Sequence, residues 1–138
     1  MISLFENLGN KVITIEKKDK VKYHAAAAVC SNLVVGLINM SENLLKECGF
    51  DEKSAHEAIT PIVMGNIKHI INDGTVNALT GPIQRNDIGT VKKHLECLND
   101  DEKRTYKAVS LEVLKVAGNR DKNIDYSEME EILKWKLQ

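Results

Sequence analysis

The sequence predicts an all-α protein, a helical bundle built around one long helix. Three observations lead to this prediction. Apolar residues recur at spacings of three and four through most of the chain, which is the period of an amphipathic helix. Capping residues and glycines stand at the ends of these stretches. After residue 17, no stretch shows the signals of a strand.

The first residues differ from the rest of the chain. Residues 3–8 look like the last turns of a helix that ends at Gly9, and residues 12–15 are a short β-branched run typical of a strand. Such a strand finds no partner later in the chain. A lone helix and strand are what the end of a preceding α/β domain would leave. We therefore assign residues 1–17 as a remnant or linker and residues 18–138 as the helical domain.

The long helix is expected between an N-cap at Asp19 and a stop at Gly49. Its apolar positions are Ala26, Cys30, Leu33, Leu37, Met40, Leu44 and Cys48. At about 1.5 Å per residue it would span on the order of 45 Å, which exceeds what one compact domain of this size needs. A helix of this length forms the spine of a bundle or crosses into another subunit. Cys30 and Cys48 are expected as small buried hydrophobic side chains rather than as reactive thiols.

Four shorter helices are expected after it. They span residues 52–72, 88–98, 100–118 and 126–137. Short polar side chains would cap the first three, Asp51 for the first, Asp87 for the second, and Asn99 or Asp100 for the third. Pro61 removes a backbone donor inside the first of these helices and should kink or break it.

Composition argues against several classes of function. Hydrophobic residues make up 43% and charged residues 28% of the chain, as in ordinary soluble globular proteins. The net charge is −1 and the 19 basic residues are spread out, whereas a nucleic-acid binder needs a concentrated basic face. Charged or amide residues interrupt every apolar run, so we expect no membrane span. Three cysteines without a C-x-x-C pair favour a reducing cytoplasm, and neither they nor the histidines have metal-ligand spacing.

Polar residues appear on the long helix where core residues are expected. Around the helix axis, Ser31 lies about 20° from His24, and Asn32 lies about 80° away. These three side chains therefore share one side, with Tyr23 next to His24. Such a stripe can offer hydrogen-bond donors and acceptors to a polar ligand. A solvated face, or polar groups satisfied inside the core, explains the same spacing.

A second candidate is the loop that includes Thr80, Gly81, Pro82 and Arg85, just before the helix that Asp87 caps. A loop at a helix N-terminus presents backbone N–H groups, which favour anions. The Arg85 guanidinium would add two parallel hydrogen bonds to a carboxylate. The alternative is a plain connecting loop with Asp87 as its capping residue.

Together the two motifs resemble a bacterial family of NAD(P)-dependent oxidoreductases. The motifs are Tyr23-His24-Ala25-Ala26-Ala27 followed by Ser31-Asn32, and later Leu79-Thr80-Gly81-Pro82-Ile83 with Arg85 and Asp87. Members of this family have an N-terminal Rossmann domain and a C-terminal helical domain of unassigned function. They are similar to pyrroline-5-carboxylate reductase, ketopantoate reductase and 6-phosphogluconate dehydrogenase. The resemblance covers residues 5–98, and the helices after Leu98 match only in kind.

The resemblance implies a helical domain like the C-terminal domain of 6-phosphogluconate dehydrogenase. In such relatives the active site lies in the cleft between the two domains, and the long helix lines it. His24 and Asn32 would then be catalytic, with His24 donating a proton or orienting the substrate and Asn32 hydrogen-bonding a substrate oxygen. The implied substrate-binding residues are Tyr23, Ser31, Thr80, Gly81, Pro82 and Arg85.

The resemblance also implies NADP or NAD as the cofactor of a full-length member, and a homodimer formed through the long helix. The substrate would be a small carbonyl compound, imine or hydroxyacid. Hydride transfer needs a cofactor held at a glycine-rich turn between a strand and a helix. This chain contains no G-x-G-x-x-G motif, so we expect it to bind no cofactor and to be inactive by itself.

Two alternatives stay open from the sequence. A stand-alone helical dimerisation or interaction module without catalysis accounts for the same helices, and alanine at His24 and Asn32 would then change nothing. An independent small enzyme would need a nucleophile–base pair or a metal site, and the sequence shows neither.

Overall fold

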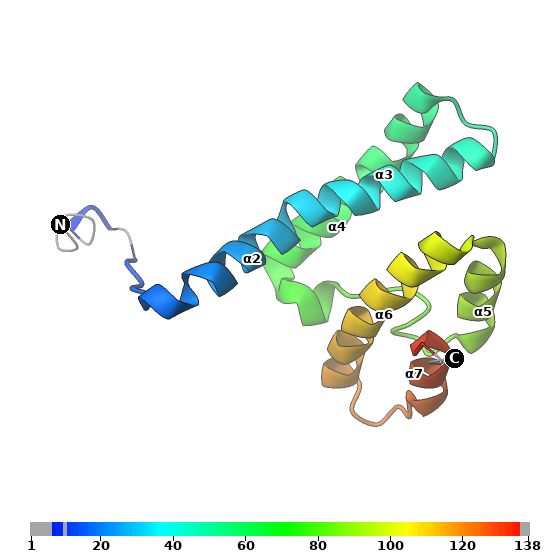
Figure 1. Ribbon diagram of the computed structural model, residues 1–138. Coiled ribbons are helices and arrows are strands. Elements are labelled where there is room, and N and C mark those ends of the chain that lie inside the picture. Colours follow the sequence, from blue (N-terminus) through cyan, green and yellow to red (C-terminus); the bar gives the residue numbers. More distant parts are fainter. Residues whose placement is uncertain (1–6, 10, 136–138) are drawn as a thin grey trace. The chain divides into compact units, whose positions relative to one another are not determined.

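The computed structural model describes residues 7–9 and 11–135. Its elements are a 3-10 turn, η1 (Lys17–Asp19), and the helices α2 (Lys20–Cys30), α3 (Asn32–Glu47), α4 (Glu52–Ala78), α5 (Ile88–Cys97), α6 (Asp100–Arg120) and α7 (Ser127–Leu133) (Figure 1). The described residues contain no strand, which confirms the all-α class. The chain divides into two compact units, residues 1–49 (unit 1) and residues 50–138 (unit 2). The domain boundary near residue 17 stays a prediction.

The predicted strand at residues 12–15 is wrong. Residues 11–16 have no regular secondary structure, and the side chains of Ile13 and Ile15 are exposed. A strand is held by backbone hydrogen bonds to a neighbouring strand, and the described part of the chain offers none. Most of the helix predicted before it, residues 3–6, lies outside the described residues.

The predicted single long helix is also wrong, because it is interrupted at Ser31. The backbone of Ser31 has φ −123° and ψ −80°, so α2 ends before it and α3 begins after it. The Ser31 hydroxyl donates to the carbonyl oxygen of Ala27 at 2.6 Å. Serine bonded back to the preceding turn in this way weakens and bends helices. The predicted stop is confirmed, since Gly49 follows α3 with a φ of +95° that favours glycine.

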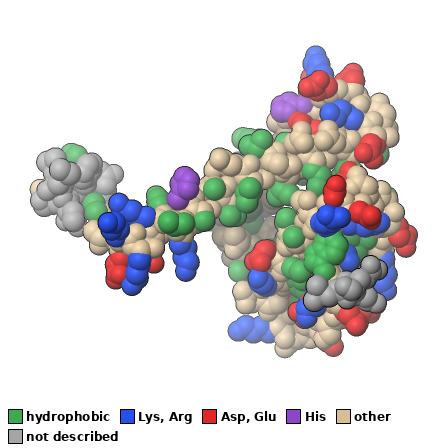
Figure 2. Space-filling view, in the orientation of Figure 1, with side chains coloured by type: hydrophobic (Ala, Val, Ile, Leu, Met, Phe, Trp, Pro, Cys, Tyr) green, Lys and Arg blue, Asp and Glu red, His purple; other side chains and the backbone are tan. Residues whose placement is uncertain are grey.

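Many apolar side chains of unit 1 are exposed. Neither α2 nor α3 has a buried residue, and the side chains of Val21, Leu33 and Val35 are 79%, 59% and 67% exposed. Figure 2 shows hydrophobic side chains at the surface along this part of the chain. Cys30 and Cys48 are exposed as well, so the prediction that they are buried is wrong. Helical periodicity identifies an apolar position, but not whether another part of the same chain covers it.

The helical stretch Lys17–Glu47 is long and apolar enough to cross a membrane, judged by length and composition among the described residues. Its most apolar 18-residue window has a mean hydropathy of 1.4 and is not buried. Residues 23–41 contain no Asp, Glu, Lys or Arg, and the amide side chains of Asn32 and Asn39 interrupt them as expected. The stretch meets the length and composition of a membrane-spanning helix all the same. One such helix is weak support for a membrane span, because core helices of soluble proteins share these properties.

The helices of unit 2 begin at the predicted caps. The carboxylate of Asp51 accepts a hydrogen bond from the Ser54 amide at 2.7 Å at the start of α4. Asp87 caps α5 in the same way, and Asn99 caps α6. At α6 the cap is reciprocal, since the Glu102 side chain accepts from the Asn99 amide at 2.8 Å.

Helix α4 runs through Pro61, and its non-helical backbone angles lie instead at Gly74, where φ is +77°. The break predicted at Pro61 therefore does not occur there. Ala55 and Ile59, which precede the proline, are buried. The left-handed conformation at Gly74 suits glycine, which has no Cβ to clash.

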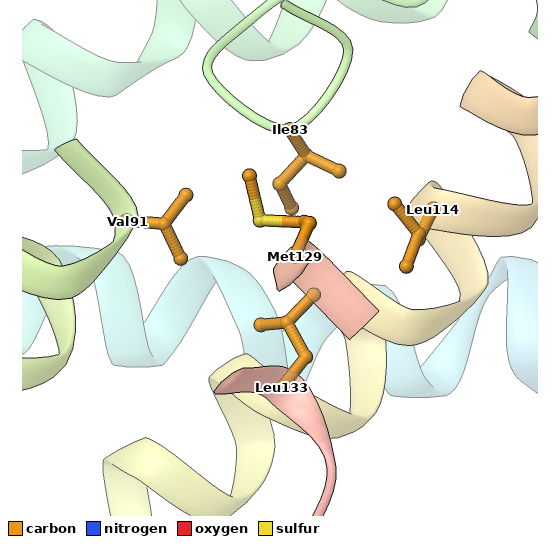
Figure 3. Packing of buried hydrophobic residues seen from close by; sticks show 5 residues of the cluster. All are labelled: Ile83, Val91, Leu114, Met129 and Leu133. Atoms are coloured by element: carbon orange, nitrogen blue, oxygen red, sulfur yellow. The ribbon is translucent and has the colours of Figure 1, made fainter. Parts of the chain in front are cut away.

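The core of unit 2 forms where α5, α6, α7 and the loop after α4 meet. Its buried members are Ile83, Val91, Leu114, Met129 and Leu133. Figure 3 shows Ile83 reaching from the loop toward Met129, with Val91 and Leu114 on either side and Leu133 beyond. Because Ile83 belongs to the loop of residues 79–87, the core anchors one side of that loop.

Candidate functional site

The predicted site residues form two groups, one in each unit. Unit 1 holds Tyr23, His24, Ser31 and Asn32, and unit 2 holds Thr80, Gly81, Pro82 and Arg85. Within each unit the residues lie close along the chain.

The group in unit 1 spans the interruption between α2 and α3. Tyr23 and His24 lie on α2 with exposed side chains, whereas Asn32 is the first residue of α3. The angular spacing predicted between His24 and Asn32 assumed one continuous helix. With non-helical backbone angles at Ser31, that spacing no longer applies, although the residues still belong to one short segment.

The side chains of Ser31 and Asn32 meet at this interruption. The Ser31 hydroxyl lies 2.6 Å from the Ala27 carbonyl oxygen and 3.2 Å from Asn32 Oδ1. A serine hydroxyl has one hydrogen, so it donates to the Ala27 oxygen or to the Asn32 oxygen but not to both, and the nearer Ala27 oxygen is the favoured acceptor. The NH₂ group of Asn32 can donate to another molecule. A donor of this kind suits a carbonyl, hydroxyl or carboxylate oxygen of a ligand. The role that the resemblance implies for Asn32 stays a prediction.

The loop of residues 79–87 uses several of its own backbone amides. The amide of Arg85 donates to the Gly81 carbonyl at 3.1 Å, and that of Asn86 donates to the Ile83 carbonyl at 3.1 Å. The Asp87 amide donates to the Pro82 carbonyl at 2.8 Å. These three amides close the loop on itself, so they are not donors for an anion from solution.

A carboxylate of the chain itself already occupies the N-terminus of α5. Asp87 accepts from the Thr90 amide at 3.0 Å and from the Thr90 hydroxyl at 2.7 Å. The Thr90 amide, followed by its hydroxyl and by the charges of Arg85 and Lys93, lowers the pKa of Asp87 below its usual value. A second anion at this helix end would face a negative charge. Of the groups predicted to bind an anion here, the Arg85 guanidinium is the one that stays exposed.

The backbone of the loop turns at Gly81, whose φ of +110° disfavours any residue with a side chain. Thr80 and Arg85 have exposed side chains, whereas Pro82 is half-buried. Gly81 and Pro82 therefore shape the loop, and Thr80 and Arg85 are the predicted residues whose side chains are available to a ligand.

Sequence reasoning missed a set of hydrogen bonds that ties this loop to the end of α6 and the start of α7. The Tyr126 hydroxyl donates to the Gln84 carbonyl at 2.7 Å, and the Gln84 side-chain amide donates to Asp121 Oδ2 at 3.0 Å. The Asn86 side-chain amide donates to the Asp125 carbonyl at 2.9 Å. The partners are 37 to 42 residues apart in the sequence, so no local spacing signals them.

Two residues of this hydrogen-bonded segment, Tyr126 and Asp125, have shifted pKa values. Burial raises the pKa of Tyr126 above its usual value, and the Asp121 carboxylate adds to this effect. The phenol is therefore a neutral donor at physiological pH. The Ser127 hydroxyl and amide lower the pKa of Asp125. Asp125 is thus a carboxylate that fixes the backbone at the start of α7.

A shallow groove of about 630 Å³ runs between α6 and α7, within the size range of small-molecule sites. Its apolar lining includes Leu111, Tyr126 and Trp135, and its charged lining residues form the ion pairs Lys115–Glu112 and Lys134–Glu130. None of the predicted site residues lines it. In the described ranges, no cluster of three or more His, Cys, Asp or Glu side chains is arranged to hold a metal ion.

The chain matches a known protein family. Residues 1–113 match the family described as "Domain of unknown function (DUF2520)", which covers most of the chain and both candidate groups. No curated protein matches the chain, and no solved structure does. The residues that follow, including Asp121, Asp125 and Tyr126, lie outside the matched range.

Proposed function

This chain belongs to the family described as domain of unknown function DUF2520, and we propose that it is the helical part of an NAD(P)-dependent oxidoreductase. In this proposal a Rossmann domain, supplied outside these residues, holds NADP or NAD. The helical part contributes side chains to the substrate cleft and the surface for dimerisation. The substrate is a small carbonyl compound, imine or hydroxyacid. Substrates of this kind are used by pyrroline-5-carboxylate reductase, ketopantoate reductase and 6-phosphogluconate dehydrogenase, to which the oxidoreductases that this chain resembles are similar.

The observation that carries the proposal is the uncovered apolar surface of α2 and α3. These helices bury no residue although residues 23–41 carry no charge. Exposing so much apolar surface to water is unfavourable, by about 25 cal/mol per Å². An exposed apolar surface of this kind favours association with a partner. An α/β domain or a second copy of the chain would bury it.

The polar residues of unit 1 would then face a cleft rather than water. His24 would donate a proton to the substrate or orient it, and the Asn32 NH₂ group would donate to a substrate oxygen. The Ser31 hydroxyl, which lies 3.2 Å from Asn32 Oδ1, would stand beside the asparagine in this cleft. Tyr23 would pack beside the substrate, and Thr80 and Arg85 would bind a polar or carboxylate end of it.

The first test is the intact mass of the gene product in its own cells, followed by turnover. We expect a product about 15 kDa heavier than the 15.4 kDa of this chain, enough for a Rossmann domain of roughly 150 residues. That product is then screened for NADPH-dependent reduction of small ketones and imines. Loss of the imidazole in His24→Gln should lower kcat by at least about 100-fold, the usual contribution of a general acid.

The control for this variant is His69→Gln, which changes an exposed histidine of α4 outside both candidate groups. Its kcat should equal that of the unmodified protein. A native product of 15.4 kDa that supports no turnover would refute the oxidoreductase proposal. The stand-alone interaction module, which accounts for the same uncovered helices, would then be the better explanation.

A further inference from the structure

The loop that carries Arg85 is held in place from several directions. Ile83 is buried in the core of unit 2, and Arg120 donates from its guanidinium to the Leu79 carbonyl. Gln84 and Asn86 are each tied by side-chain hydrogen bonds to the segment between α6 and α7. The Asn86 backbone takes a φ of +54°, which is uncommon outside glycine and persists where surrounding contacts fix it.

One side chain of this anchored segment is exposed. Arg85 stands between Gln84 and Asn86, and it is exposed while both of its neighbours are partly buried. A long cationic side chain on a fixed backbone loses less conformational freedom on binding an anion than one on a mobile loop. The hydrogen-bonded segment therefore prepares Arg85 for a ligand without touching it.

We propose that Tyr126 is a positioning residue for Arg85, acting through its hydrogen bond to the Gln84 carbonyl. The bond is 2.7 Å long and partly buried, and it acts on the peptide group that joins Gln84 to Arg85. The role of Arg85 as a ligand-binding residue rests on the proposed function. The tie itself is a property of the fold and can be tested without a cofactor or substrate.

This assignment extends the candidate site beyond the part of the chain that defines the family. The family match ends at residue 113, whereas Asp121, Asp125 and Tyr126 follow it. The loop thus belongs to the family region, and the segment that fixes it belongs to the residues after that region.

The test is Tyr126→Phe in the full chain, which removes the hydroxyl and keeps the ring. By NMR, the ¹³C′ resonance of Gln84 should move to lower frequency because its carbonyl loses a hydrogen bond. Amide hydrogens of Arg85, Asn86 and Asp87 should exchange about fivefold faster, the factor expected for one typical hydrogen bond. Amides of α5 and α6 should keep their rates.

The matched control is Tyr106→Phe, since that hydroxyl lies 2.9 Å from His94 Nδ1 and does not contact the loop. It should leave the Gln84 resonance and the loop amides unchanged. Unaltered loop exchange in Tyr126→Phe, or equal acceleration throughout unit 2, would overturn the positioning role. Neither result depends on NADPH turnover, so failure here is distinguishable from failure of the oxidoreductase proposal.

Discussion

Three aspartates in unit 2 combine a hydrogen bond from a nearby backbone amide with a lowered pKa, and two of them, Asp51 and Asp87, cap helices. Asp51 and Asp87 accept from the amides of Ser54 and Thr90, and Asp125 accepts from the Ser127 amide. In each case hydrogen bonds to the charged carboxylate lower the pKa below the usual value of 3.8. The ionised form is therefore more favourable in the folded chain than in the unfolded chain.

These carboxylates predict a loss of stability in acid. Because their folded pKa values lie below the unfolded ones, their contribution is present above about pH 4 and is lost as the pH falls through the folded values. Thermal unfolding followed by circular dichroism should show a falling midpoint below about pH 4. The double variant Asp51→Asn with Asp87→Asn should flatten this dependence, because neither amide titrates.

Asp100→Asn is the control for the acid prediction, since this exposed residue is in the first turn of α6 but is not its cap. Its unfolding midpoint should follow the same pH dependence as that of the unmodified chain. An unchanged dependence in the double variant would show that other groups govern acid unfolding.

Caps were predictable from the sequence because a cap is a local interaction. Asp51, Asp87 and Asn99 each bond an amide two or three residues ahead, so the signal lies within one short stretch of sequence. The burial of Cys30 and Cys48 was not predictable in this way. Both cysteines are exposed, because a position on the apolar face of a helix is buried only where another surface packs against it.

Helix α7 holds the core of unit 2 together. Met129 and Leu133 are fully buried on its inner side, where they meet Val91 of α5, Leu114 of α6 and Ile83 of the loop (Figure 3). This short helix therefore joins elements that are far apart in the sequence. It also places Tyr126, its N-cap residue, against the loop of residues 79–87.

Truncation of Met129 should destabilise unit 2 strongly. Met129→Ala leaves a cavity among fully enclosed neighbours, and we expect the free energy of unfolding to fall by about 2–5 kcal/mol. Urea denaturation followed by tryptophan fluorescence measures the change, because Trp135 follows α7. Ile62→Ala on α4, where the side chain is 71% exposed, should change it by less than about 0.5 kcal/mol. Equal losses in the two variants would contradict this assignment of the core.

The elements show which structural features periodicity can predict. Apolar spacing located every helix of unit 2, and the Gly-Pro loop was placed correctly. The same spacing fits one helix from residue 20 to residue 48 as well as it fits two, so the interruption at Ser31 was missed. The strand at residues 12–15 was misassigned because β-branched residues favour a strand only where a neighbouring strand is present.

The molecule as a whole has one covered and one uncovered part. Unit 2 has its own buried core, whereas α2 and α3 of unit 1 contribute no buried residue. A stable association buries about 1,200–2,000 Å² in total. The candidate residues His24 and Asn32 lie on this exposed part. A partner that covers α2 and α3 would therefore also determine which ligands can reach these two residues.

Self-association through these helices is the expected outcome in solution. Sedimentation equilibrium at tens of micromolar should give a mass of twice the 15.4 kDa of one chain. The double variant Leu33→Asp with Val35→Asp should have the mass of a single chain. Burying two carboxylates in an apolar interface is strongly unfavourable. Ile124→Asp, at an exposed apolar position of unit 2, should leave the mass doubled. A monomer that binds lipid vesicles would contradict this prediction and favour a membrane partner.

Local sequence patterns predict only part of the candidate site, just as they predict only part of the fold. The polar side chains of residues 23–32 and the exposed arginine of the loop could be selected from composition and local pattern. The ties from Tyr126, Asp121 and Asp125 could not, because they depend on how α6 and α7 pack against the loop. Tertiary packing brings together residues that no short stretch of sequence connects.

The exposed cysteines allow the distance between the two units to be measured by fluorescence. Cys30 and Cys48 belong to unit 1 and Cys97 to unit 2, so Cys48→Ser leaves one thiol in each unit. A donor and an acceptor dye attached to these thiols would report the separation of the units through energy transfer. Adding NADPH, substrate or unlabelled chain would then reveal which of them draws the units together or apart.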